Sequence, residues 1–271
     1  MDLNLKFKKR INLAIIGGSY DSTIAKTHLK SILATNNYKI VCGCFSKNKK
    51  KNQKNSQFYS LPINKIYNDY KKLIFQEHQN IELALILTPP NQRLNIYLNL
   101  IKKKIGIISE KPFEGSINNA RKVFNILKNK NFFYVSTYNY LGYPAIMEIK
   151  PIIKKIGSIN NVILRMPQQA STLKNNKMKI WRKKDKFIPN LHLDLASHLI
   201  SLIIYFFNDL PIEVKSNETI DNKNKFINNA FTLLKFKQFP GLLWFSKNAT
   251  GSRNPNKYLT QFENIIGKYC R

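Results

Sequence analysis

The sequence has few acidic residues, glycines and cysteines, and no apolar run long enough to span a bilayer. Its 271 residues include 15 Asp and Glu against 45 Lys and Arg, together with 10 Gly and 3 Cys. Three cysteines cannot all be paired within the chain, and Cys42 and Cys44 fall inside one predicted strand, which excludes a disulfide framework. This pattern predicts a reducing, cytoplasmic location, no membrane-spanning segment and no metal site.

The shortage of acidic residues leaves a formal net charge of +30. Such a charge attracts phosphate backbones, so a polyanion-binding role is one hypothesis. The lysines are nevertheless spread along the whole chain and accompany Asn and Ile, as happens when coding sequence drifts toward A and T. Because no recognised binding module accompanies the charge, we expect no specific nucleic-acid partner and only weak, nonspecific polyanion binding.

The first half of the chain alternates short apolar runs with helical patterns. This alternation indicates βαβ units, right-handed crossovers and a parallel, doubly wound sheet. The predicted strands are 11–18, 38–45, 81–90, 105–110 and 132–139, and the predicted helices are 22–35, 63–77, 93–104 and 117–130, with a basic helix or loop before residue 63. Helix 22–35 is expected to place Ile24, Ala25, His28, Leu29, Ile32 and Leu33 on one face.

The pattern changes in the second half, which favours two domains, 1–143 and 144–271. A helix over 142–157, a strand over 161–168 and an apolar helix over 193–207 come first. Strand-like runs then follow without intervening helices, which indicates a mostly antiparallel sheet. These predicted strands are 212–219, 225–236, 240–248 and 258–266.

The turn between the first strand and the first helix is where a dinucleotide would bind. Glycines there let the backbone approach a pyrophosphate, but no full GxGxxG can be written, and Asp21 is interpreted as a helix cap whose charge opposes a phosphate. The candidate cofactor residues of this turn are Gly17, Gly18, Ser19, Thr23 and Ile24.

The end of the second strand bears on the choice of cofactor. An acidic residue at this point would bind the ribose hydroxyls of NAD, and "CFSKNKKK" has none. Ser46 and Lys47 are instead suited to a 2′-phosphate, which slightly favours NADP over NAD.

The stretch "SEKP" ends the fourth of these strands with Glu110, Lys111 and Pro112. The proline fixes its own φ and restricts the residue before it, so the chain leaves the sheet in a defined direction. Lys111 is thereby aimed off the carboxyl edge of the sheet, where ligands bind in open parallel sheets. An ordinary solvated lysine at a strand end is the alternative.

Asp194 and His198 are four residues apart in the helix predicted over 193–207, so they share one face. A carboxylate beside an imidazole orients the ring and favours its use in proton transfer near neutral pH. The alternative is a polar pair whose members satisfy each other inside an apolar helix.

In this order, "TPP", "SEKP", "YNYLGYP" and the DxxxH helix resemble the Gfo/Idh/MocA oxidoreductase family from about residue 10 onward. The resemblance implies an N-terminal Rossmann domain followed by an α/β domain with an open, mostly antiparallel sheet. It also implies hydride transfer between NAD(P) and a secondary alcohol of a sugar, sugar nucleotide or cyclitol in a cleft between the domains. A homo-oligomer is expected if the second sheet is complete enough.

The resemblance implies a role for each matching residue. Lys111 would lie beside the nicotinamide and the substrate hydroxyl, and His198 would be the acid/base, oriented by Asp194. The other cofactor residues would be Thr88, Pro89, Pro90, Glu110, Asn139, Trp181 and Arg182, and the candidate substrate residues are Tyr140, Tyr143, Gln168 and Gln169.

The sequence departs from the family pattern at several points. Arg93 stands where many relatives have a histidine, and "IPNLH" replaces a Gly-rich approach to the DxxxH helix. Two other departures keep an alternative open, because the phosphate turn is poor in glycine and the sequence ends where relatives continue. The second domain is therefore expected to be shortened. The alternative is a noncatalytic relative that keeps the architecture as a binding or scaffold protein.

Overall fold

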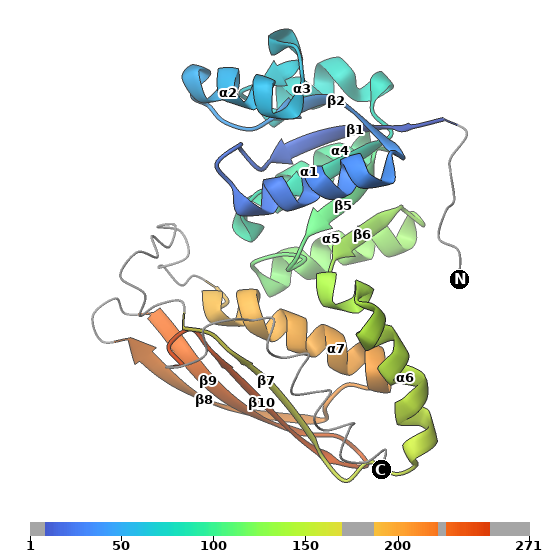
Figure 1. The fold of residues 1–271 in the computed structure, drawn as a ribbon, viewed down its shortest axis with the longest axis vertical. Helices are drawn as coiled ribbons and strands as arrows, with labels where there is room; N and C mark the ends of the chain where they lie inside the picture. Colours follow the sequence, from blue (N-terminus) through green and yellow to red (C-terminus); the bar gives the residue numbers. More distant parts are fainter. Residues whose placement is uncertain (1–8, 170–186, 222–225, 250–271) are drawn as a thin grey trace. The chain divides into compact units, whose positions relative to one another are not determined.

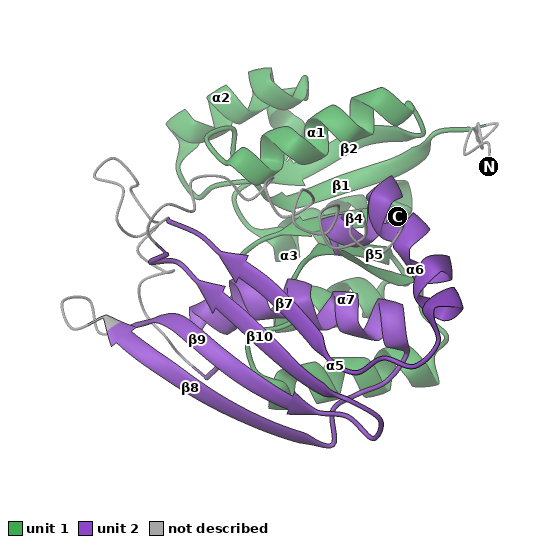
Figure 2. Ribbon diagram, turned by 60° about the horizontal axis from the view of Figure 1, so that its bottom comes forward, with its two compact units in different colours: residues 1–137 green, residues 138–271 purple. Residues whose placement is uncertain are grey.

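The computed structural model describes residues 9–169, 187–221 and 226–249. The chain divides into two compact units, residues 1–137 and 138–271, which are coloured separately in Figure 2. The predicted strand 258–266 and the candidate residues Trp181 and Arg182 lie outside the described residues.

The first unit contains a parallel six-stranded sheet with the strand order β3-β2-β1-β4-β5-β6. Helices cover both faces of the sheet, so β1 is buried on each side. Leu13 and Ile15 pack against α1 and α2 on one face. Ala14 and Ile16 pack against α3, α4 and α5 on the other face. A strand buried on both faces reads as a continuous apolar run, which is why "INLAII" was recognisable in the sequence. The elements are β1 (Ile11–Gly17), α1 (Thr23–Thr35), β2 (Tyr38–Cys44), α2 (Lys49–Tyr59), β3 (Ile66–Tyr67), α3 (Tyr70–Glu77), β4 (Leu83–Leu87), α4 (Arg93–Lys102), β5 (Gly106–Glu110), α5 (Ile117–Asn129) and β6 (Tyr134–Thr137). Figure 1 labels all of them except β3 and β4.

Three local predictions in this unit are wrong. Residues 63–77 do not form one helix: a 3₁₀ turn and the short strand β3 come first, and α3 begins only after Asp69, whose carboxylate accepts from the Lys71 N–H at 2.6 Å. Asp21 is not the cap of α1, because Ser22 occupies the N-cap position. Ile24 and Leu33 do not join the buried face of α1, since they are 37% and 69% exposed.

The second unit contains a mixed four-stranded sheet with the order β7-β10-β9-β8. β8, β9 and β10 are antiparallel as predicted, whereas β7 runs parallel to β10. The helices α6 and α7 lie along one face of this sheet (Figure 1). Their apolar residues pack with sheet side chains such as Leu164, Leu234 and Leu243. The elements are α6 (Pro144–Ile156), β7 (Val162–Pro167), a π-helical turn (His192–Ala196), α7 (Ser197–Phe207), β8 (Glu213–Asp221), β9 (Phe226–Lys235) and β10 (Pro240–Ser246).

The predicted fold class is confirmed: a doubly wound parallel sheet precedes a second α/β unit with a mostly antiparallel sheet. Among the described residues, none of the helices combines the length and the apolar character needed to cross a membrane.

Candidate active site

The carboxyl ends of β1 and β4 come very close together at Gly17 and Gly18. Both glycines have positive φ, 88° and 71°. A Cβ on Gly17 would lie 2.7 Å from the Leu87 carbonyl carbon and 2.7 Å from the Thr88 nitrogen, so only glycine fits. The turn therefore depends on these two glycines even without a full GxGxxG.

The residues around this turn fit the anionic part of a dinucleotide. No side chain caps the first turn of α1, whose helix begins directly after the turn, so its N–H groups carry the partial positive charge of a helix N-terminus. The Thr88 hydroxyl is buried and has no hydrogen-bond partner within the described part of the chain. A buried hydroxyl without a protein partner is the kind of group that a ligand satisfies. Of the other candidates here, Pro90 is buried, and Thr23 and Ile24 are exposed at the start of α1.

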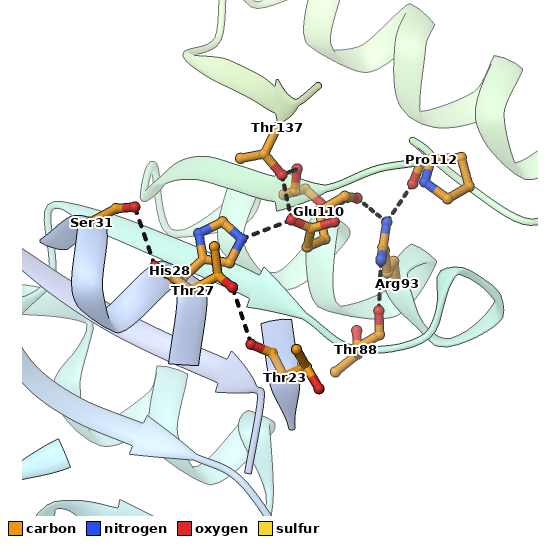
Figure 3. Close-up of polar contacts among 10 residues, drawn as sticks. Thr23, Thr27, His28, Ser31, Thr88, Arg93, Glu110, Pro112 and Thr137 are labelled. Atoms are coloured by element: carbon orange, nitrogen blue, oxygen red, sulfur yellow. Dashed lines mark hydrogen bonds and ion pairs between the residues drawn. The ribbon is translucent and has the colours of Figure 1, made fainter. Parts of the chain in front are cut away.

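Glu110 ends β5 with its carboxylate held from two sides (Figure 3). Its Oε1 accepts from the Thr137 hydroxyl at 2.8 Å and lies 2.7 Å from His28 Nε2. Burial alone would raise the pKa of this carboxyl group, but the hydrogen bonds from His28 and Thr137 and the charges of His28 and Lys111 lower it overall. Glu110 is thus a fixed anion that links α1, β5 and β6.

Arg93 joins the segments that follow β4 and β5. Its side chain is 2% exposed, and Nε and Nη2 donate to the Thr88 carbonyl at 2.9 and 2.7 Å. Nη1 donates to the carbonyls of Glu110 and Pro112 (Figure 3). The residue noted in the sequence as a departure from a histidine therefore fixes the backbone on both sides of Lys111.

Lys111 follows Glu110 directly at the edge of the parallel sheet and is half-buried. The peptide bond between Lys111 and Pro112 is cis. The ammonium charge lies close enough to the Glu110 carboxylate to contribute to lowering the pKa of that group. The structure thus brings Gly17, Thr88, Glu110 and Lys111 to one edge of the first unit.

Ser46 and Lys47 lie directly after β2, as predicted from the sequence. The Ser46 hydroxyl accepts from the Asn48 N–H at 3.1 Å, and Lys47 is exposed. Sequence reasoning missed Asn55 and Tyr59 of α2, both of which hydrogen-bond to the Gly17–Ser22 turn. Their only signal is a helical spacing within a run of Lys and Asn that was attributed to composition.

In the second unit, Asp194 has a partner that the sequence did not predict. Asp194 lies in the π-helical turn before α7, not in a continuous α-helix, and its Oδ2 is 2.7 Å from the ammonium of Lys247. The Lys247 side chain is only 5% exposed. Lys247 follows β10, far from Asp194 in sequence, so no local spacing could have identified this ion pair.

His198 begins the buried face of α7, beside two tyrosines that belong to the same unit. The imidazole packs edge-on against the Tyr140 ring at 4.8 Å and against Tyr138 at 6.2 Å, measured between ring centroids. Burial raises the pKa of Tyr140, and the charges of Tyr143 and Asp194 raise it further. Tyr140 therefore lies near both His198 and Asp194, so these three side chains form one cluster.

The remaining candidates of the second unit occupy other positions. Asn139 donates to the Tyr143 hydroxyl at 3.4 Å, so these two residues are neighbours. The main chain of Gln168 pairs with Ser246 and Ala249, which places Gln168 and Gln169 at the end of β7. The roles given to all these residues stay predictions.

Comparisons with known proteins agree with this architecture. Residues 11–138 match the model of the oxidoreductase family with an NAD-binding Rossmann fold, GFO_IDH_MocA. An uncharacterised oxidoreductase of Schizosaccharomyces pombe is 28% identical over 153 residues, which cover 55% of this chain and 39% of that protein. The chain therefore spans about two fifths of the length of this relative.

Solved structures share the fold. An inositol dehydrogenase homologue from Azotobacter vinelandii, complexed with NADH and myo-inositol, superposes with a TM-score of 0.82 at 21% identity, covering 91% of this chain and 66% of that one. Levoglucosan dehydrogenase with NADH and L-sorbose superposes with a TM-score of 0.79 at 19% identity, covering 91% and 69%. At these identities the similarity establishes the fold alone. The family match over residues 11–138 identifies the first unit as the NAD-binding Rossmann fold of the Gfo/Idh/MocA oxidoreductase family.

Proposed function

We propose that the protein is an NAD(P)-dependent oxidoreductase acting on a secondary alcohol of a sugar, sugar nucleotide or cyclitol. The observation that carries this proposal is the edge where Gly17, Thr88, Glu110 and Lys111 meet, in a chain of an NAD-binding oxidoreductase family. The myo-inositol and L-sorbose bound to the two solved structures support a polyhydroxylated substrate. The nicotinamide, when bound, supplies or accepts the hydride.

In this proposal, side chains of the protein stabilise the charge on the reacting oxygen and transfer the proton of the substrate hydroxyl. We assign to Lys111 the polarisation of the reacting oxygen through its ammonium group. His198 takes the hydroxyl proton, and Asp194 fixes the polar environment of the imidazole together with Tyr140. Glu110 keeps the end of β5 in place beside Lys111, since His28 and Thr137 both bind its carboxylate.

The finer parts of the proposal concern cofactor, assembly and location. The exposed Lys47 and the neighbouring Ser46 support a slight preference for NADP, because no carboxylate follows β2 to bind the ribose hydroxyls. A homo-oligomer is proposed through the sheet face of the second unit that α6 and α7 do not cover. A cytoplasmic location is consistent with the thiols of Cys42 and Cys44, which are not disulfide-bonded.

Titration of the purified protein with NADH and with NADPH, followed by nicotinamide fluorescence, tests the proposal. We expect saturable binding of at least one, and turnover when a panel of polyols and sugars is added with the oxidised cofactor. Saturable binding with no turnover on any member of the panel would instead support the noncatalytic alternative. If neither dinucleotide binds, the oxidoreductase proposal is wrong.

A further inference from the structure

One face of α2 supports the Gly17–Ser22 turn through three hydrogen bonds. Asn55 Oδ1 accepts from the Ser19 hydroxyl at 3.1 Å and from the Tyr20 N–H at 2.8 Å. The Tyr59 hydroxyl donates to the Gly18 carbonyl at 2.5 Å. These contacts reach three consecutive residues of the turn, and residues 55 and 59 are one helical turn apart, so they share a face.

The amides on this face continue from the turn to the end of β2. Asn55 Nδ2 donates to Asn52 Oδ1 at 3.3 Å, and Asn52 Nδ2 donates to the Ser46 carbonyl at 2.9 Å. The exposed fraction is 0% for Asn55 and 7% for Asn52. Burying amides is unfavourable unless they are hydrogen-bonded, so this network is specific to one arrangement of its members.

Two further contacts of α2 involve the turn and the residues that follow β2. Lys51 lies one helical turn before Asn55, and its ammonium is 3.1 Å from Asp21 Oδ2. This pair offsets the carboxylate that would otherwise repel a phosphate. The Tyr59 ring stacks on Phe45 at 4.3 Å, and burial raises the pKa of Tyr59, so its hydroxyl stays a donor.

We propose that Asn52, Asn55 and Tyr59 are positioning residues that hold the phosphate-binding turn and the residues after β2 in their binding arrangement. The inference rests on the proposed dinucleotide-binding function. A turn with only Gly17 and Gly18 at its start loses conformational freedom when a ligand orders it, and this loss weakens binding. The buried network removes that freedom before the ligand arrives.

Two variants test the proposal by dinucleotide affinity. Tyr59→Phe removes only the hydroxyl that reaches Gly18, and Asn55→Leu removes the acceptor for Ser19 and Tyr20 at similar volume. Because each change deletes a hydrogen bond that orders the turn, the Kd for NADH or NADPH should rise about fivefold or more, by fluorescence titration or calorimetry. Unchanged affinity in both variants would overturn the proposal.

Asn48→Ala is the matched control in the same helix. Asn48 caps α2 by accepting from the Lys51 N–H at 3.2 Å, and its side chain does not reach the turn. The control should lower the melting temperature without changing the Kd. An equal loss of affinity in Asn48→Ala would mean that α2 acts only through its stability, and the proposal would fail.

Hydrogen exchange without cofactor separates this inference from the proposed function. Tyr59→Phe and Asn55→Leu should speed amide exchange of residues 17–22 severalfold relative to the wild type and to Asn48→Ala. If the wild-type protein binds neither dinucleotide while exchange responds in this way, the proposed function fails but the ordering of the turn stands. Unchanged exchange in both variants, with wild-type binding intact, contradicts the inference alone.

Discussion

At the scale of single residues, the polar side chains at the edge of the parallel sheet differ in role. Glu110 and Arg93 are both committed to protein partners: Glu110 to His28 and Thr137, and Arg93 to three main-chain carbonyls. Lys111 lies between their contacts, next to a carboxylate that stays ionised. Lys111 follows Glu110 at the carboxyl edge of the sheet, and its ammonium is the group to which we assign the action on a ligand.

Replacing Lys111 by methionine tests this difference in role. Because Met keeps the length of the side chain but lacks the ammonium, kcat should fall about 10²-fold to 10³-fold. The Kd for NADH should change little, since the turn and α1 are untouched. Stopped-flow assays and fluorescence titration measure the two quantities, and full activity in Lys111→Met would remove this residue from the mechanism.

Glu110 should make the stability of the first unit depend on pH. Folding lowers the pKa of the Glu110 carboxyl group from its ordinary value of 4.5. The ionised carboxylate therefore stabilises the fold fully above pH 4.5, and this contribution is lost as the pH falls through the lower pKa of the folded protein. Glu110→Gln should therefore cost about 1–3 kcal/mol near pH 7 and progressively less below about pH 4.5. Urea unfolding of both proteins from pH 7 to pH 3 measures the difference, and a constant difference would contradict the assignment.

At the scale of elements, α4 controls two loops because it begins with Arg93. The guanidinium binds the carbonyls of Thr88, Glu110 and Pro112, so the segments after β4 and β5 cannot move independently. Their common anchor is a single side chain that is 2% exposed.

Arg93→Met should destabilise both loops together. Three part-buried carbonyls would lose their donor, and a buried guanidinium would be replaced, so we expect a loss of about 3 kcal/mol or more in unfolding free energy. Hydrogen-exchange mass spectrometry of peptides from β4 and β5 measures the effect, with the exposed Arg121→Met of α5 as the control. Faster exchange in one loop only would show that Arg93 does not couple them.

The sequence predicted elements well where apolar periodicity was strong and poorly where a distant partner decided the outcome. β1, β4 and β5 are apolar on both faces, so each was visible in the sequence. The short strand β3 holds two residues, too few to show a period, and was absorbed into a predicted helix.

The candidate site shows the same limit. Glu110 and Lys111 follow from a local motif, but their partners do not: His28 is 82 residues from Glu110 in sequence, and Lys247 meets Asp194 only because β10 ends beside the π-helical turn. The helical spacing of Asn55 and Tyr59 was too weak a signal, because an amide in a Lys- and Asn-rich helix has the composition of an exposed face. Burial of such a residue is a tertiary property.

At the scale of the whole molecule, the second unit exposes apolar residues on the sheet face away from its helices. Phe231 and Leu233 of β9 are 45% and 60% exposed, and Ile163 of β7 is 47% exposed. The Phe231 ring stacks on Trp244 of β10 at 5.6 Å. Exposed apolar surface of this kind is typical of an interface, in agreement with the proposed homo-oligomer.

Leu233→Lys should therefore weaken self-association. A charge at the centre of this face is unfavourable in an apolar interface, so the mass by light scattering should fall toward the 31.6 kDa of one chain. Leu210→Lys is the control, because Leu210 is 62% exposed but precedes β8 and lies outside the sheet. A wild-type protein that is monomeric at high concentration would refute the proposed assembly.

The two partners of Glu110 also set when the site can form during synthesis. His28 precedes Glu110 by 82 residues, and Thr137 follows it by 27. A nascent chain still on the ribosome cannot complete this carboxylate's contacts until β6 has emerged from the exit tunnel. Any affinity for a dinucleotide should accordingly be acquired late in translation of the first unit, in one step and not gradually.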